Sequence, residues 1–150
     1  MQAPMFRSRD MTKQGNKGNK SAPLANHHES PLRLVLQVAD PAGGTTRVVS
    51  ARLNKARLIA GRVSTDSDTP LPAPDLDFSA LNGLNNGVSR QHAAFLYEEG
   101  SLSVEDLSST NGTRINGFQI QPGRTYRLRN GDELEFGRLR MTVKIIRTPH

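Results

Sequence analysis

Three short groups of polar residues could together bind an anion that carries several oxygen atoms. They are, in chain order, Gly61-Arg62, then Ser89-Arg90-Gln91-His92, then Ser108-Ser109-Thr110-Asn111-Gly112-Thr113 followed by Asn116-Gly117. The guanidinium of Arg62 can offer a planar fork of donors to two phosphate oxygens. Ser89 can add a short hydroxyl donor, and Arg90 a second positive charge. These residue types fit a phosphorylated side chain, which is nearly a dianion with three acceptor oxygens.

Each group lies at the end of a predicted strand, so a β-sheet scaffold would position it. Residues from Leu32 to Val38 alternate with the period of two that is typical of a strand. Further strands are expected at 47–52, 57–61, 92–98, 101–106, 113–116, 125–128, 132–136 and 141–146. Turn pairs such as Asn116-Gly117 and Asn130-Gly131 separate them. Many short strands without helical periodicity predict an all-β sandwich.

One segment, Val63 to Asn86, interrupts this regular spacing of strands. It is rich in Ser, Asp, Pro, Gly and Asn, and a long irregular connection inside a compact domain is usually functional or mobile. We expect Asp75 to Leu81 to pack as a short strand, and Ser64 to Pro74 to remain mobile.

Residues 1–30 predict a disordered basic tail in front of one domain. They contain no Val or Ile, and five basic residues stand against two acidic ones, a net charge of +3. Such a segment cannot bury enough apolar surface to offset the entropy lost on ordering. The domain is expected at residues 31–147, and residues 148–150 form the C-terminal end.

The composition excludes several classes of protein. The 150 residues include no Cys, which excludes disulfides, thiolate metal sites and cysteine nucleophiles. No apolar run approaches the ~20 residues of a membrane helix, and the N-terminus lacks the apolar stretch of a signal peptide. We therefore expect a cytoplasmic protein without membrane contact, cofactor or metal. The formal net charge of +6 points to an anionic partner.

The three groups resemble the pattern of the forkhead-associated (FHA) domain family, in which GR, SxxH and NG occur in that order. The resemblance covers about Leu32 to Ile146. The chain is similar to a stand-alone bacterial-type member of the family. It implies an FHA-like β-sandwich of two twisted, mostly antiparallel sheets with the binding loops at one end. It also implies that the loops bind phosphothreonine, with a small apolar slot for the threonine methyl group.

The resemblance assigns a role to ten residues of the three groups. Arg62 and Ser89 would be the principal phosphate ligands, and Arg90 and Thr110 would assist them. Asn111 would hydrogen-bond the backbone of the extended peptide. Five further residues would support the binding loops; they are Gly61, His92, Gly112, Asn116 and Gly117.

The sequence departs from some family members two residues before the loop serine. Those members carry a basic residue there, which binds an acidic residue further along the peptide. This chain has Gly87 at that position. A preference for Asp at the third position after phosphothreonine is therefore not expected from this position.

Two functions from different classes remain open at this point. The first is a non-catalytic adaptor that binds a threonine-phosphorylated protein and so depends indirectly on a Ser/Thr kinase. The alternative is polyanion or nucleic-acid binding through the basic tail, with the FHA-like domain as a phosphate-independent scaffold. We do not expect nucleic acid as the partner, because the tail has Phe6 as its one aromatic residue for stacking on bases. The sequence shows no P-loop, metal-ligand cluster or Ser/His/Asp arrangement, so we do not expect an enzyme.

Overall fold

The computed structural model describes residues 32–39, 43–64 and 70–147. The tail predicted at residues 1–30 and the C-terminal end at 148–150 lie outside these segments, as do residues 40–42 and 65–69. The boundaries of the tail and the domain therefore stay predictions.

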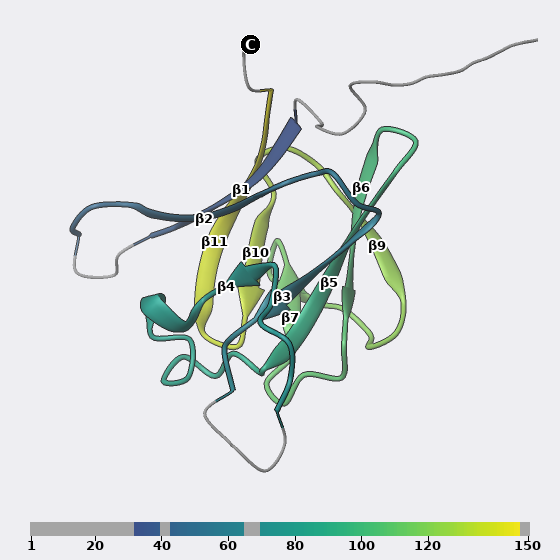
Figure 1. The fold of residues 1–150 in the computed structure, drawn as a ribbon. Helices are drawn as coiled ribbons and strands as arrows, with labels where there is room; N and C mark the ends of the chain where they lie inside the picture. The colour runs from purple at the N-terminus through teal and green to yellow at the C-terminus, as the bar shows by residue number, and fades with distance from the viewer. Residues whose placement is uncertain (1–31, 40–42, 65–69, 148–150) are drawn as a thin grey trace, which may run out of the picture.

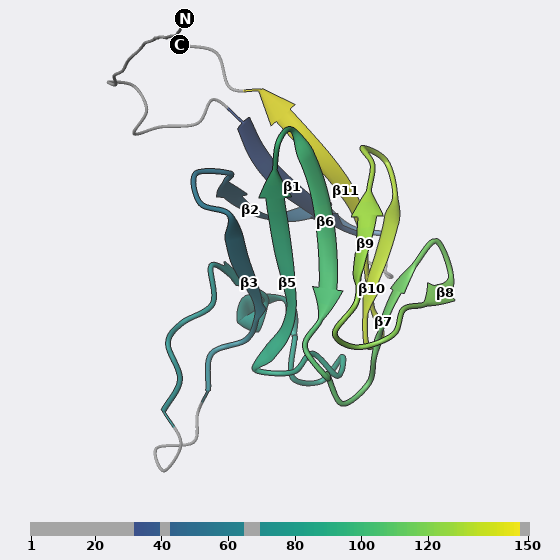
Figure 2. The same cartoon turned by 90° about the vertical axis from the view of Figure 1, so that its right-hand side faces the viewer.

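Two sheets form the described part of the chain (Figures 1 and 2). The six-stranded sheet has, in spatial order, β2 (Arg47–Arg52), β1 (Leu32–Val38), β11 (Leu139–Arg147), β10 (Glu133–Phe136), β7 (Thr113–Ile115) and β8 (Phe118–Gln119). The five-stranded sheet has β4 (Leu76–Asp77), β3 (Arg57–Gly61), β5 (Gln91–Glu98), β6 (Ser101–Asp106) and β9 (Thr125–Leu128). The strands described pair antiparallel, except that β4 runs parallel to β3. The predicted all-β sandwich is confirmed.

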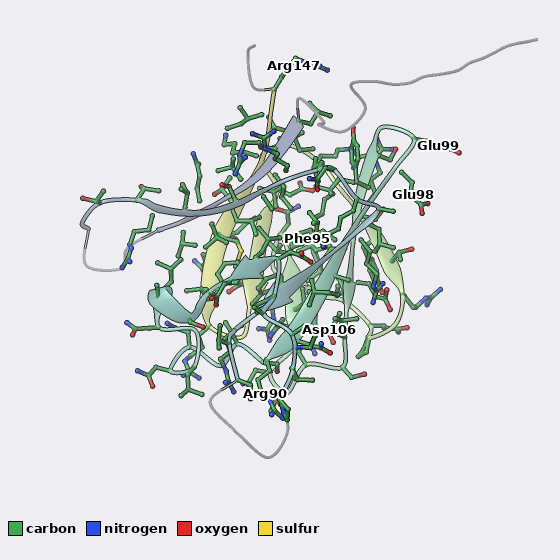
Figure 3. All side chains as sticks on the ribbon, viewed as in Figure 1. Arg90, Phe95, Glu98, Glu99, Asp106 and Arg147 are labelled. Atoms are coloured by element: carbon green, nitrogen blue, oxygen red, sulfur yellow. The ribbon has the colours of Figure 1, made fainter. Side chains whose placement is uncertain are left out.

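The alternation predicted for β1 places its apolar side chains between the sheets. Leu34, Leu36 and Val38 are buried, and β1 pairs antiparallel with β2. Phe136 lies at the centre of the core, with its ring 5.5 Å from that of Phe78 and 6.3 Å from that of Phe95. Figure 3 shows Phe95 in the middle of the molecule. The core therefore joins strands of both sheets.

The segment predicted as a strand at Asp75 to Leu81 forms a strand over two residues only. Leu76 and Asp77 pair with β3, and the chain then makes a one-turn 3-10 helix at Ser79–Leu81. The carboxylate of Asp77 accepts hydrogen bonds from the backbone N–H of Ser79 (2.9 Å) and from its hydroxyl (2.7 Å). A side chain that bonds its own backbone two residues ahead favours a turn over a strand, which explains the difference.

The two ends of the sandwich differ in what they carry. At one end, Leu32 pairs with Arg147, so the first and last strands lie side by side. Figure 3 shows Arg147, Glu98 and Glu99 at this end and Arg90 at the opposite end. The loops that follow β3, precede β5 and join β6 to β7 gather around Arg90. No helix in the described part of the chain is long and apolar enough to cross a membrane.

Candidate functional site

The sheet order brings the three predicted groups together at one end of the sandwich. Strand β5 pairs with β3 on one side and with β6 on the other, so the loops attached to these strands are neighbours. The backbone N–H of Arg62 donates to the carbonyl of Arg90 (3.2 Å). The backbone N–H of Thr110 donates to the hydroxyl oxygen of Ser89 (3.1 Å). Residues far apart in the sequence thus form one connected surface.

A polar hollow of about 350 Å³ lies between these loops. Four of the five residues predicted to bind the phosphopeptide line it; these are Arg62, Ser89, Arg90 and Thr110. Three further lining residues had not been predicted as ligands: Leu71, and Gln91 and Ser108, which belong to the predicted groups. No carboxylate lines the hollow among the residues that the structure describes. Its charge is therefore positive, as an anion site requires.

The side chain of Arg62 is fixed by one nitrogen and open at the other two. Its Nε donates to the carbonyl of Val88 at 2.7 Å, which holds the half-buried guanidinium in place. The two terminal nitrogens have no partner in the described part of the chain. They form a planar pair of donors beside the hollow, the geometry that suits two oxygens of one phosphate group.

The hydroxyl of Ser89 is held in a way that leaves its proton available. The oxygen accepts from the backbone N–H of Thr110, and a hydroxyl that accepts with one lone pair can still donate its proton elsewhere. Arg90 lies beside it, half-buried, and its guanidinium approaches the hydroxyl of Ser64 at 3.5 Å. This long contact leaves most of the donors of Arg90 for another acceptor.

His92 is fully buried and connects two of the loops. The backbone N–H of Ser89 donates to Nδ1, and Nε2 lies 3.0 Å from the carbonyl of Gly112. Since an N–H can only donate and a carbonyl can only accept, Nδ1 is the bare nitrogen and Nε2 carries the hydrogen. Both ring nitrogens are therefore occupied, and His92 has none left to act as a base.

Burial lowers the pKa of His92 below its ordinary value of 6.5, although the carbonyl of Gly112 and the carboxylate of Asp106 act in the opposite direction. The ring also stacks on Phe136, with centroids 4.6 Å apart. The imidazole is thus held neutral, and it joins the binding loops to the hydrophobic core.

Asn111 lies beside the hollow rather than in its lining. Its side-chain N–H donates to the carbonyl of Gly87 at 3.0 Å, and the residue is exposed. A Cβ atom at Gly87 would lie 2.6 Å from the Asn111 amide nitrogen, and Gly87 has a φ of +83°. The Asn111 amide therefore occupies the space in which a side chain at position 87 would begin, so a basic residue would not fit there as the loops are arranged.

Asp106 organises the loop between β6 and β7, and the sequence interpretation missed it. Its buried carboxylate accepts from the hydroxyls of Ser109 and Thr113, both at 2.6 Å, and from the backbone N–H of Ser109 at 3.1 Å. Figure 3 shows Asp106 close to the end of the molecule that carries Arg90. The available signal was an Asp at a strand end, three residues before a Ser, which is a common turn arrangement.

The glycines and the asparagine that were predicted to support the loops lie at close contacts and tight turns of the loops. A Cβ atom at Gly61 would lie 2.0 Å from the carbonyl oxygen of Arg90, so only glycine lets the two loops approach this closely. Asn116 and Gly117 have φ values of 50° and 87° and form the tight turn from β7 to β8, which favours these residue types. Gly112 supplies the carbonyl that His92 binds.

The described segments hold no group of three or more His, Cys, Asp or Glu side chains that could bind a metal ion. What the site can offer a ligand is a set of hydrogen-bond donors and two positive charges. The assignment of individual residues as phosphopeptide ligands stays a prediction.

Comparison with known proteins identifies the family. The family model of the FHA domain matches residues 58–137 of this chain. This match confirms the resemblance to the FHA family. The oxoglutarate dehydrogenase inhibitor of Corynebacterium diphtheriae is 33% identical over 105 residues, which cover 69% of this chain and 67% of that protein. The glycogen accumulation regulator GarA of Mycolicibacterium smegmatis is 43% identical over 54 residues, covering 36% of this chain and 32% of the relative.

Other matches differ in how much of each protein they cover. Protein FraH of Nostoc is 42% identical over 65 residues, which cover 43% of this chain and only 22% of FraH. The chain therefore spans between a fifth and two thirds of the length of these relatives. The crystal structure of the FHA domain of CT664 from Chlamydia trachomatis superposes with a TM-score of 0.53 at 22% identity, over 75% of this chain and 96% of that one. This likeness shows the fold.

Proposed function

The chain belongs to the FHA domain family, and we propose that it is a non-catalytic adaptor that binds phosphothreonine in a partner protein. The observation that carries this proposal is the arrangement of free donors at the hollow between the binding loops. Among the described residues, the two terminal nitrogens of Arg62 and the hydroxyl proton of Ser89 have no partner, and Arg90 adds a second positive charge.

The proposal assigns the remaining residues of the site to the peptide around the phosphothreonine. Asn111 keeps its amide oxygen free of partners in the described residues and can accept from a peptide N–H. Leu71 is the one apolar side chain that the structure describes in the lining of the hollow. It is the candidate contact for the threonine methyl group, which would favour phosphothreonine over phosphoserine.

The names of the relatives support an adaptor whose output comes through binding. One relative is named an inhibitor of oxoglutarate dehydrogenase and another a regulator of glycogen accumulation. We propose by analogy that this chain changes the activity or the location of a threonine-phosphorylated protein in the cytoplasm, with a Ser/Thr kinase controlling the interaction.

A peptide library tests the proposal directly. Peptides with one fixed phosphothreonine are titrated against the intact protein and against Arg62→Ala. We expect dissociation constants on the order of micromolar, equivalent to about −8 kcal/mol, and no binding to the unphosphorylated peptides. Loss of two charge-assisted hydrogen bonds, at about 1.5–3 kcal/mol each, should weaken Arg62→Ala by roughly a hundredfold or more.

The matched control is Arg127→Ala, which removes an exposed arginine from β9 that does not line the hollow. It should bind as the intact protein does. Equal binding of phosphorylated and unphosphorylated peptides would contradict the proposal. Binding to DNA or heparin that falls steeply with salt but does not change in Arg62→Ala would favour the polyanion alternative.

A further inference from the structure

Strand β5 contains a β-bulge beside the proposed phosphate site. Ala60 of β3 pairs with Ala93, but the next residue of β3, Gly61, pairs with Gln91. Strand β5 therefore has one more residue than β3 between these two pairs, which defines a bulge. Bulges change the direction of the side chains that they contain, and they are common next to functional sites.

The bulge reverses the direction of Gln91. Ala93 and Phe95 belong to the core, and strict alternation from these residues would also direct Gln91 inward. His92 takes the inward direction instead, because its buried ring stacks on Phe136 of the opposite sheet. Gln91 is consequently exposed and lines the hollow between the binding loops.

Ser108 lines the same hollow in a backbone conformation that serine rarely adopts. Its φ is +57°, which lies in the left-handed region that favours glycine and asparagine. The side chain is exposed and has no hydrogen-bond partner in the described segments. Backbone strain of this kind is concentrated at binding sites, and here the strained residue gives the fold no side-chain contact in return.

Gln91 and Ser108 form one wall of the hollow. Strands β5 and β6 pair antiparallel, and Figure 2 shows the start of β5 beside the end of β6. The backbone N–H of Leu107 continues this pairing by donating to the carbonyl of His92 at 3.0 Å. Gln91 and Ser108 are the next residues along the two chains, so they lie opposite each other at the hollow.

This wall offers donors that Arg62 does not supply. The planar fork of Arg62 suits two phosphate oxygens, and the third oxygen of a tetrahedral phosphate lies outside the plane of that fork. Ser89 offers one hydrogen bond to it. The amide N–H of Gln91 and the hydroxyl of Ser108 add two further donors, and neither has a partner among the residues that the structure describes.

We propose that Gln91 and Ser108 are further ligands of the phosphate group, and that they donate to the oxygen outside the plane of Arg62. The inference rests on the proposed phosphothreonine function. The bulge in β5 gives Gln91 its direction toward the phosphate. Serine at position 108 keeps a donor there that a relaxed glycine would lack.

The experiment measures affinity and stability of the same variants with one selected phosphothreonine peptide. Gln91→Ala and Ser108→Gly should each weaken binding by roughly fivefold to tenfold, as expected for the loss of one hydrogen bond to a charged group. Ser108→Gly should at the same time raise the urea midpoint, because glycine adopts a φ of +57° without strain. A weaker complex of a more stable protein distinguishes a ligand from a residue that only supports the loop.

The pKa of the bound phosphothreonine reports the phosphate contact directly. Hydrogen bonds from the protein favour the dianion, so they lower the second phosphate pKa, which is ordinarily about 6. Loss of a donor in Gln91→Ala or Ser108→Gly should therefore raise this pKa in the complex. A pH titration of the bound peptide followed by phosphorus NMR measures it.

Two control variants accompany these measurements. Ser108→Asn keeps both the left-handed conformation and an N–H donor, so it should bind nearly as tightly as the intact protein. Gln37→Ala removes the same kind of side chain from β1, outside the hollow, and should leave the affinity unchanged.

The outcomes separate this inference from the proposed function. Normal affinity of Gln91→Ala and Ser108→Gly, with binding lost only in Arg62→Ala, would overturn the inference and leave the phosphothreonine function standing. An unchanged phosphate pKa in both variants would also overturn it, and so would a Ser108→Gly protein that loses stability together with affinity. Failure of the intact protein to bind any phosphothreonine peptide would overturn the proposed function itself.

Discussion

At the scale of single residues, the atoms that hold each side chain differ from the atoms it presents to a ligand. Arg62 is anchored through Nε and presents its terminal nitrogens. Ser89 is anchored through its oxygen and presents its proton. Because these donors are already in place, a phosphate would bind without the entropic cost of ordering them. The same division explains why replacing Arg62 by another cation is not equivalent, since Lys has no Nε–H to anchor it.

His92 adds a pH dependence to the stability of the domain. Its pKa in the folded protein is lowered by burial, so the unfolded chain takes up a proton first as the pH falls. The contribution of neutral His92 is present in full above pH 6.5 and is lost as the pH falls through 6.5 toward the lower pKa of the folded state. Urea unfolding at pH 7.5 and pH 5.5 should therefore show a clear drop in the midpoint.

The matched variant for this measurement is His92→Gln, because Gln does not titrate. Other groups contribute equally to both proteins, so the difference between the intact protein and His92→Gln isolates the histidine. The midpoint of His92→Gln should be lower at pH 7.5 and fall less between the two pH values. Parallel pH dependence of both proteins would show that His92 does not titrate in this range.

At the scale of elements, the strands and the order of the binding loops could be predicted from the sequence. Strand ends carry the motif residues, and the predicted bounds of β3, β6 and β9 match the structure. The two-residue strand β8 was not predicted, since it is too short to show alternation. The role of Asp106 was also missed. Its importance comes from its burial, which depends on the packing of distant strands and leaves little local signal.

Asp106 should be the residue on which the β6–β7 loop depends most. In Asp106→Asn the shape is kept, but an amide nitrogen replaces one oxygen that accepts hydrogen bonds from Ser109 or Thr113. Buried hydrogen bonds to a charged group contribute about 1.5–3 kcal/mol each, so the free energy of unfolding should fall by about 2–3 kcal/mol. Hydrogen exchange at the backbone N–H of Ser109 and Gly112 should accelerate, and phosphopeptide affinity should fall with it.

Asp77→Asn provides the control for Asp106→Asn, because both carboxylates accept hydrogen bonds from the backbone N–H and the hydroxyl of a nearby serine, but Asp77 does so at the surface. Asp77 accepts from the backbone N–H and the hydroxyl of Ser79, two residues later, and it is exposed. Its substitution should cost less than about 1 kcal/mol. Equal effects of the two substitutions would mean that burial of Asp106 adds nothing to its hydrogen bonds.

At the scale of the whole molecule, the core and the binding loops share one aromatic side chain. Phe136 contacts Phe78 and Phe95 in the core, and it also contacts His92, which holds the loops. His92 forms hydrogen bonds with both Ser89 and Gly112. A substitution that weakens packing around Phe136 should therefore also change the positions of the binding loops. The domain is therefore a single unit in which packing and recognition are connected.

Phe136→Ala tests this connection. The side chain is completely buried, and removal of a buried Phe typically costs about 3–5 kcal/mol. Phe118→Ala is the matched control, because Phe118 is 78% exposed and its loss should change stability by no more than about 0.5 kcal/mol. Denaturant unfolding gives both values. A core that tolerates Phe136→Ala with a cost below 1 kcal/mol would refute the central role of this ring.

The pairing of β1 with β11 also determines when the nascent chain can finish folding. All strands of the five-stranded sheet have been synthesised once Leu128 is made. The six-stranded sheet, by contrast, joins Leu32 to Arg147, so it cannot close until its last residues leave the ribosome. Until then β1 has β2 on one side and an unpaired edge on the other, the kind of surface on which growing chains associate wrongly. Synthesis of the final nine-residue strand is the step that removes this edge.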